Sequence, residues 1–142
     1  MFDFRIYNNV TSITFPNNVK MINTNFSSAF YYMENLQMIN FNHLNVVNMY
    51  SAYYYCINLT GSPACGPNVT NMSNTYSWCY SLIGNPVCGD NVTDMTYTYY
   101  NCSNLIGSPV CGNKVTSMSG AYYNCRNLIE SPVCGDNVTI MH

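Results

Sequence analysis

Apolar positions recur along this chain with a period of 23 residues. The clearest of these positions is held by five valines: Val46, Val69, Val92, Val115 and Val138. The residues around them repeat as well, which defines four units: 45–67, 68–90, 91–113 and 114–136. A fixed period of about 20 to 50 residues is typical of stacked structural repeats. The pattern therefore predicts that residues 23 positions apart are neighbours in space.

Within one unit the spacing of apolar positions changes from helical to extended. In unit 91–113 four inward-facing positions have the spacing i, i+3, i+4, i+7: Met95, Thr98, Tyr99 and Cys102. This spacing marks one face of a helix of about two turns. Pro109 then leads into Val110-Cys111, which is enough for a very short strand. The expected fold is an α/β solenoid of about five coils, each with a short helix and a short parallel strand.

The two ends of the repeat array differ. Residues 1–25 are expected to form an N-terminal cap, and residues 26–142 the repeat solenoid, with a partial coil at 137–142. Polar side chains interrupt the apolar positions of the cap: Arg5, Asn8, Asn9, Asn17, Asn18 and Lys20. The C-terminal end has no comparable cover, so Val133, Val138 and Met141 form a candidate assembly edge. We therefore expect self-association through the C-terminal coil.

Composition narrows the classes of partner. Only 7% of residues are charged, against about 25% in a typical soluble domain. Asn, Ser, Thr and 14 tyrosines must therefore supply the polar surface, which suits contact with a protein or a glycan. The net charge of −2 and four scattered basic residues argue against nucleic-acid binding. No apolar run is long enough for a membrane span, and the first residues do not match a signal peptide.

The repeat resembles a known family. Asn91-Val92-Thr93-Asp94-Met95, followed by Tyr99, Cys102 and Leu105, is similar to the leucine-rich repeats of BspA-like bacterial surface proteins and of related mycoplasma lipoproteins. The likeness covers roughly four-fifths of the chain. It departs at 107–111, Gly-Ser-Pro-Val-Cys, where the family usually has a longer Leu-x-Leu strand. The resemblance implies a leucine-rich-repeat-like array that acts as a surface-exposed interaction module, found also in some phage tail proteins, with no catalytic residue.

All eight cysteines belong to two columns of equivalent positions. The first holds Cys56, Cys79, Cys102 and Cys125, and the second holds Cys65, Cys88, Cys111 and Cys134. Disulfides within a repeat, such as Cys79–Cys88, are one interpretation. Buried free thiols are the other, favoured because Met33 occupies the first column in the degenerate first coil. The Cys-x8-Cys spacing and the isolated His43 and His142 do not match a metal site.

The array contains no residue that is chemically unique. Asp90 and Asp136 share a turn position with Pro67 and Asn113, so that position requires a turn former rather than a carboxylate. His43 is expected to be a solvated loop residue. We therefore expect no enzymatic activity and no cofactor.

Aromatic residues give the candidate binding surface. The core is expected to contain Tyr53, Tyr76, Tyr99 and Tyr122. The residue that follows each of them, which is Ser77 in one unit and tyrosine in the others, should be partly exposed. The candidate surface comprises Tyr54, Tyr55, Trp78, Tyr100 and Tyr123. Such a strip suits a sugar face or a protein partner, and the alternative is a partly covered helix flank.

These observations favour an interaction or adhesion module on a bacterial surface or a virus particle. The alternative is a structural protein that assembles end to end as a filament or virion component. A weaker option is an ice-binding array, suggested by a threonine column at Thr70, Thr93, Thr116 and Thr139.

Overall fold

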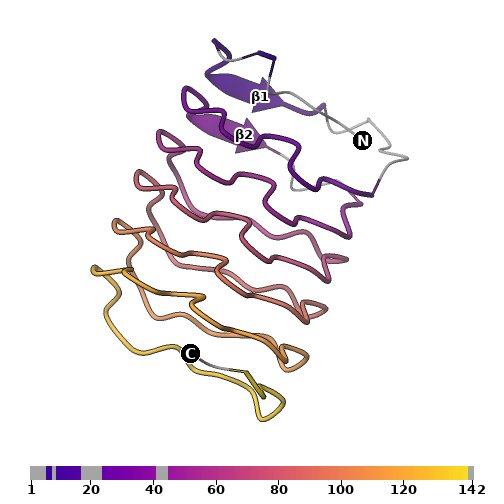
Figure 1. Cartoon of the computed structure of the whole chain (residues 1–142), viewed down its shortest axis with the longest axis vertical. Coiled ribbons are helices and arrows are strands. Elements are labelled where there is room, and N and C mark those ends of the chain that lie inside the picture. The colour runs from indigo at the N-terminus through magenta and orange to yellow at the C-terminus, as the bar shows by residue number, and fades with distance from the viewer. Residues whose placement is uncertain (1–5, 8, 17–23, 41–44, 141–142) are drawn as a thin grey trace.

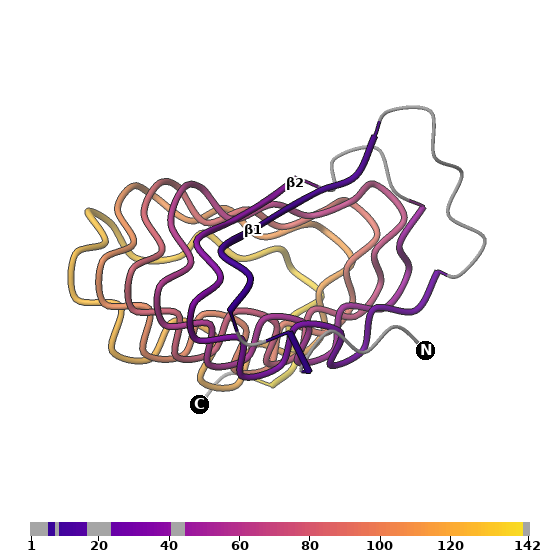
Figure 2. The ribbon, with the colours of Figure 1, turned by 90° about the horizontal axis from the view of Figure 1, so that it is seen from above.

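The chain winds into a stack of similar coils that runs from the N-terminal to the C-terminal end (Figure 1). The computed structural model describes residues 6–7, 9–16, 24–40 and 45–140. Strand β1 (Ser12–Thr14) pairs in parallel with β2 (Met38–Asn40), with Ile13 opposite Ile39. Further along, isolated parallel bridges join residues 23 apart, for example Asn48 with Asn71 and Asn71 with Asp94. Viewed along the stack, successive coils lie over one another (Figure 2).

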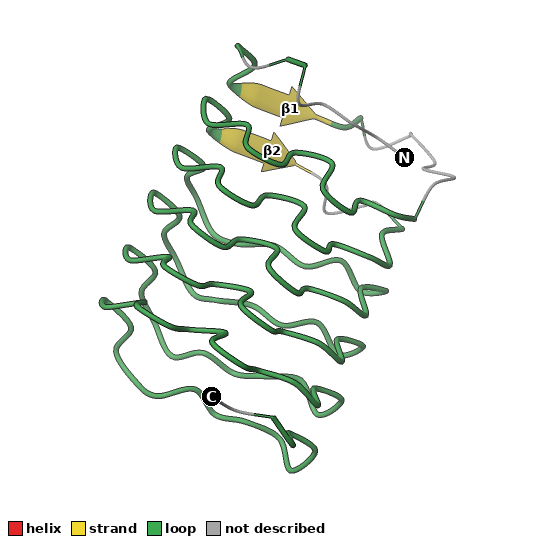
Figure 3. Cartoon of the chain, viewed as in Figure 1, coloured by secondary structure: helices red, strands yellow, loops and turns green. Residues whose placement is uncertain are grey.

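The expected α/β solenoid of helix–strand coils is wrong. The described residues contain no helix, and β1 and β2 are their only strands (Figure 3). The segments expected to be helices, such as 95–102, are runs of turns. On the return side of the coils, the expected strands are reduced to one isolated bridge between Val110 and Val133. The leucine-rich-repeat solenoid implied by the resemblance is therefore not the architecture of this chain.

Two backbone positions in every coil explain why helices do not form. Tyr97 and Asn101 have φ values of 52° and 61°, whereas an α-helix requires φ near −63°. The first of these left-handed positions is held by Ser28, Ser51, Asn74, Tyr97 and Gly120, and the second by Tyr32, Tyr55, Trp78, Asn101 and Asn124. Each one closes a tight turn. The Thr98 N–H, for example, donates to the carbonyl of Met95, three residues back, at 3.0 Å, as in a β-turn.

The alternate amides of the turn run donate to the next coil. The Met95 N–H donates to the Ser117 carbonyl at 2.9 Å, and the Tyr97 N–H donates to the Ser119 carbonyl at 2.8 Å. A helix would use these amides internally, and it is about 10 Å wide, roughly twice the spacing of hydrogen-bonded strands. A run of turns instead lets each coil bond directly to its neighbour. The run of turns still places the residues that were predicted to face inward in the core, since Met95 and Cys102 are fully buried.

The core contains a column of stacked rings, here called the core aromatic stack. Its members are Phe30, Tyr53, Tyr76, Tyr99 and Tyr122. Neighbouring ring centroids lie 5.1 to 5.6 Å apart, and the planes are within 16° of parallel. The Tyr76 hydroxyl donates to the Ala64 carbonyl at 2.6 Å and accepts from the Ala64 N–H at 3.1 Å. The stack thereby links the turn run to the return side of the coil.

The eight cysteines are free thiols. In the first column, each S–H donates to the carbonyl 26 residues earlier, at 2.9 to 3.1 Å between sulfur and oxygen. The four residues are Cys56, Cys79, Cys102 and Cys125, and all of them are buried. Burial raises the pKa of Cys56 and of Cys125 to about 12. The structure therefore adopts the free-thiol alternative rather than disulfides within a repeat.

Both ends of the stack are only partly described. Of the polar cap residues, Asn9 is described and exposed, while Arg5, Asn8, Asn17, Asn18 and Lys20 lie outside the described residues. At the other end Val133 is 60% exposed, and Val138 is half-buried against the core. Met141 lies outside the described residues.

Candidate functional site

Aromatic side chains cover one outer face of the turn runs. They come one or two positions after the rings of the core aromatic stack in the sequence. We call this surface the outer aromatic strip, formed by Tyr31, Tyr32, Tyr54, Tyr55, Trp78, Tyr100 and Tyr123. Tyr123 is 61% exposed and Tyr32 is 43% exposed, while Trp78 is partly covered.

The rings of the strip stack from coil to coil. Tyr31 and Tyr54 are 5.0 Å apart and within 12° of parallel, and Tyr100 and Tyr123 are 4.9 Å apart and within 11°. Between these two pairs the same column holds Ser77, so one ring is missing. Ser77 is only 2% exposed, which corrects the expectation that it lies partly at the surface.

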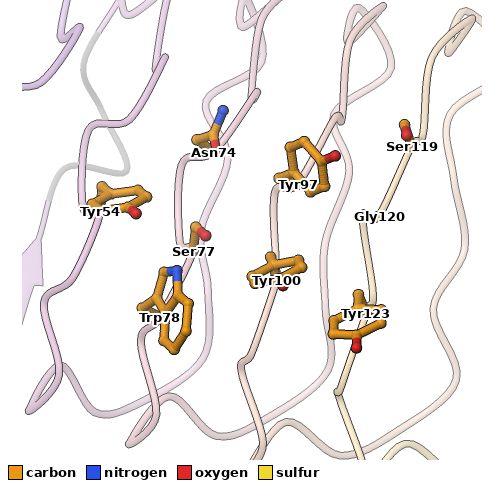
Figure 4. Close-up of a pocket in the computed structure, with 9 residues that line it drawn as sticks. All are labelled: Tyr54, Asn74, Ser77, Trp78, Tyr97, Tyr100, Ser119, Gly120 and Tyr123. Atoms are coloured by element: carbon orange, nitrogen blue, oxygen red, sulfur yellow. The ribbon is translucent and has the colours of Figure 1, made fainter. Parts of the chain in front are cut away.

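A pocket of about 440 Å³ lies where the ring is missing (Figure 4). Four of the five residues proposed from the sequence line it: Tyr54, Trp78, Tyr100 and Tyr123. The fifth, Tyr55, lies beside them, stacked on Tyr32 at 4.6 Å and 6.4 Å from Trp78. The other lining residues are Asn74, Ser77, Tyr97, Ser119 and Gly120.

A second pocket of about 410 Å³ continues the first along the stack. The two share Tyr54 and Asn74, and Tyr31, Tyr50, Ser28 and Ser51 complete the second lining. We call the two pockets together the aromatic groove. It crosses several coils, so it can contact an extended ligand that follows the stack.

Sequence reasoning missed part of the groove. Tyr31 carried a usable signal, because it lies 23 residues before Tyr54 in the degenerate first coil. Tyr97 carried none, because its side chain reaches the groove from a left-handed backbone position that a helix would not contain. There its ring packs edge-on against Tyr100, with centroids 5.4 Å apart.

The aromatic groove is uncharged. No Asp, Glu, Lys, Arg or His is among the residues that line either pocket. Partial burial, with Tyr32 and Tyr31 nearby, raises the pKa of Tyr54 above its usual value, so this hydroxyl stays neutral at physiological pH. The groove thus offers ring faces, hydroxyls and an amide, and its lining contains no carboxylate or imidazole to act as a general base.

Other candidate chemistry is not brought together. Within the described part of the chain, no cluster of His, Cys, Asp or Glu could hold a metal ion. His43 and His142 lie outside the described residues. Asp90 and Asp136 are exposed.

The threonine column has a structural role. The Thr93 hydroxyl donates to the Thr70 carbonyl at 3.1 Å, and the Thr116 hydroxyl donates to the Thr93 carbonyl at 3.1 Å. These hydroxyls therefore tie neighbouring coils together.

Comparisons with known proteins give no relative: no family model, no curated protein and no solved structure matches this chain. The resemblance to BspA-like repeats therefore stays a prediction. Among the described residues, no helix has the length and apolar character that a membrane crossing requires.

Proposed function

We propose that this chain is a non-catalytic interaction module, displayed on a bacterial surface or a virus particle, that binds its ligand through the aromatic groove. The observation that carries the proposal is an uncharged groove walled by tyrosine and tryptophan. Such rings provide a large contact area at a small cost in side-chain entropy. They are also enriched among the residues that dominate binding energy at interfaces.

The polar groups of the groove support the same proposal. Ser51, Asn74 and Ser119 supply neutral donors and acceptors beside the rings. A phosphate-rich ligand would need basic side chains, and the groove lining has none. The ligand class that fits is a protein or a glycan.

End-to-end assembly remains a second candidate. The partial coil stacks on unit 114–136, where the Met118 N–H donates to the Ile140 carbonyl at 2.9 Å, and Ile140 is 48% exposed. Val133 is 60% exposed, as is the equivalent Val110 of the preceding coil, so this outward position is exposed inside the stack as well. Exposed apolar residues beside unpaired backbone groups favour pairing with another chain. We propose self-association through this coil as the route by which a filament or virion component would form.

One experiment separates the two candidates. Purified protein is probed against arrays of glycans and cell-wall polymers, and the same sample is studied by sedimentation and negative-stain microscopy. A monomer that binds the array, and whose Tyr123→Ala variant binds more weakly, supports the interaction module. Ile106→Ala is the matched control, since Ile106 is 51% exposed and lines neither pocket. Fibres without array binding would support assembly and contradict the interaction module.

A further inference from the structure

We infer that Cys134 and Cys111 form a thiol modification site, at which a small disulfide such as glutathione disulfide reacts and leaves the two cysteines joined by a disulfide across neighbouring coils. The site lies toward the C-terminal end of the stack (Figure 1). It does not depend on the proposed binding function, because neither cysteine lines the aromatic groove.

The two cysteine columns differ in their surroundings. Every thiol of the first column is buried and donates to a carbonyl of the preceding coil. In the second column, Cys65, Cys88 and Cys134 are only half-buried. The sulfur of Cys88 accepts from the Gly112 N–H of the next coil at 3.3 Å, and the sulfur of Cys65 would lie 3.0 Å from a Cβ on Gly89 of the next coil. Sulfurs of the second column therefore reach toward the coil that follows.

The backbone holds Cys111 and Cys134 opposite each other. Val110 and Val133, the residues that precede them, form a parallel bridge. The Cys111 N–H donates to the Val133 carbonyl at 3.0 Å, and the Val133 N–H donates to the Pro109 carbonyl at 3.0 Å. Paired strands lie about 4.8 Å apart, which is inside the range of about 4.4 to 6.8 Å between Cα atoms that a disulfide can span. Among the described residues, no other pair of this column has a bridge beside it.

The Cys111 thiol is the less reactive member of the pair. Burial raises the pKa of Cys111 to about 12, and the nearby Cys134 thiol contributes to the rise. The Tyr122 hydroxyl lies 3.8 Å from the Cys111 sulfur. A thiol with this pKa keeps its proton at neutral pH, and the thiolate rather than the thiol is the nucleophile. Cys111 is therefore expected to react second, after Cys134 has been modified.

A pocket gives a small molecule access to Cys134. The pocket has a volume of about 310 Å³, and Cys134 lines it together with Tyr122, Ser131 and Pro132. Its volume is within the range of small-molecule sites. Cys111 does not line this pocket and is only 6% exposed. A small disulfide therefore reaches Cys134 and not Cys111.

The reaction consists of two thiol–disulfide exchanges. Cys134 loses its proton to solvent and attacks one sulfur of glutathione disulfide, so that a mixed disulfide forms and one glutathione leaves as a thiolate, which takes up a proton. Cys111 then loses its proton and attacks the Cys134 sulfur, so that the protein disulfide forms and the second glutathione leaves and is protonated. In total the protein gives up two electrons and two protons, and these reduce one glutathione disulfide to two glutathione molecules.

The product fastens unit 91–113 to unit 114–136, because the new bond closes a loop over residues 111–134. A disulfide stabilises a fold mainly by constraining the unfolded chain. We expect the urea midpoint of the oxidised protein to rise by about 1 M, and dithiothreitol to reverse the rise.

Peptide mapping tests the site on the intact chain. The folded protein is incubated with glutathione disulfide near neutral pH, the remaining thiols are alkylated, and the chain is digested with chymotrypsin. Cleavage after Leu105, Tyr122 and Leu128 releases Cys111 and Cys134 in separate peptides, 106–122 and 129–142, each with no other cysteine. We expect these two peptides, joined to each other, as the main oxidised product in mass spectrometry.

Serine variants assign the two roles. Cys111→Ser should stop the reaction at a mixed disulfide between Cys134 and glutathione. Cys134→Ser should abolish both the linkage and the rise in urea midpoint, and it serves as the second variant if Cys111→Ser fails to fold, since Cys134 is only half-buried. The matched control is Cys88→Ser, a half-buried position of the same column without a bridge beside it, which should keep the linkage.

Three outcomes would overturn the inference. The first is that peptides 106–122 and 129–142 are not joined after treatment of the unmodified chain. The second is that Cys65 and Cys88 become joined to the same extent, since the oxidation would then not be selective for this pair. The third is that Cys134→Ser shows the same rise in urea midpoint as the unmodified chain.

Discussion

Raising the pH from 9 to 11 should strongly destabilise this protein, because its core holds thiols that lose their protons at a lower pH in the unfolded chain than in the folded one. In the first cysteine column, desolvation raises the pKa of Cys56 and of Cys125 from about 9 to about 12. Between these values the unfolded chain loses the thiol protons and the folded chain keeps them. The stabilising effect is therefore complete below pH 9 and is lost as the pH rises toward 12.

The size of the effect follows from the two pKa values. Each pH unit above 9 lowers the free energy of unfolding by about 1.4 kcal/mol for each such thiol. At pH 11 the loss is roughly 3 kcal/mol for Cys56 and roughly the same for Cys125. Together this reaches the lower end of the total stability of a typical domain, about 5 kcal/mol. Cys79 and Cys102, whose pKa values burial also raises, add to the loss.

Urea unfolding followed by circular dichroism, under reducing conditions at intervals from pH 7 to pH 11, measures this loss. The matched variant carries Cys56→Ser and Cys125→Ser. A serine hydroxyl can donate to the same Phe30 and Tyr99 carbonyls but does not ionise in this range. The variant should be less stable at pH 7, and its stability should fall less steeply above pH 9, by about 3 kcal/mol per pH unit. Equal slopes for the two proteins would refute the argument, because these thiols would then not be protected from ionisation by folding.

Two further predictions concern the core and the C-terminal coil. Tyr76→Phe should destabilise the fold by about 1 to 3 kcal/mol in urea unfolding, because the Ala64 N–H and carbonyl both lose their hydroxyl partner; no change would mean that water replaces that hydroxyl. Val138→Lys should abolish self-association in analytical ultracentrifugation without unfolding the chain, because Val138 is only half-buried; an unmodified chain that stays monomeric at high concentration would contradict self-association.

The sequence predicted neighbours and burial better than it predicted the backbone. Residues 23 apart do lie side by side, as the bridge between Asn71 and Asp94 shows, and the inward set of each unit is buried. The spacing i, i+3, i+4, i+7 did not decide between a helix and a run of turns, since both place those residues on one face. The deciding feature is the left-handed backbone at two positions per coil. Tyr97 and Trp78 hold such positions without the glycine that usually signals them.

The candidate site was predicted in part for the same reason. Equivalent positions share a column whatever backbone carries them, so Tyr54, Tyr100 and Tyr123 could be grouped from the sequence. The depth of the groove could not, because it depends on side chains that leave left-handed turns, such as Asn74 and Tyr97. The close contact between Tyr97 and Gly120 could not be predicted from the sequence either. A Cβ at Gly120 would overlap the Tyr97 ring.

A stack of near-identical coils creates a site where one coil differs from the others. If every unit had tyrosine at the position equivalent to Ser77, the rings would form one continuous stack along the outer aromatic strip. Where serine replaces one ring, Trp78 interacts with both flanking tyrosines: it is hydrogen-bonded to Tyr54, and its ring lies 5.7 Å from that of Tyr100. The residues that break the repeat, rather than those that maintain it, therefore shape the aromatic groove.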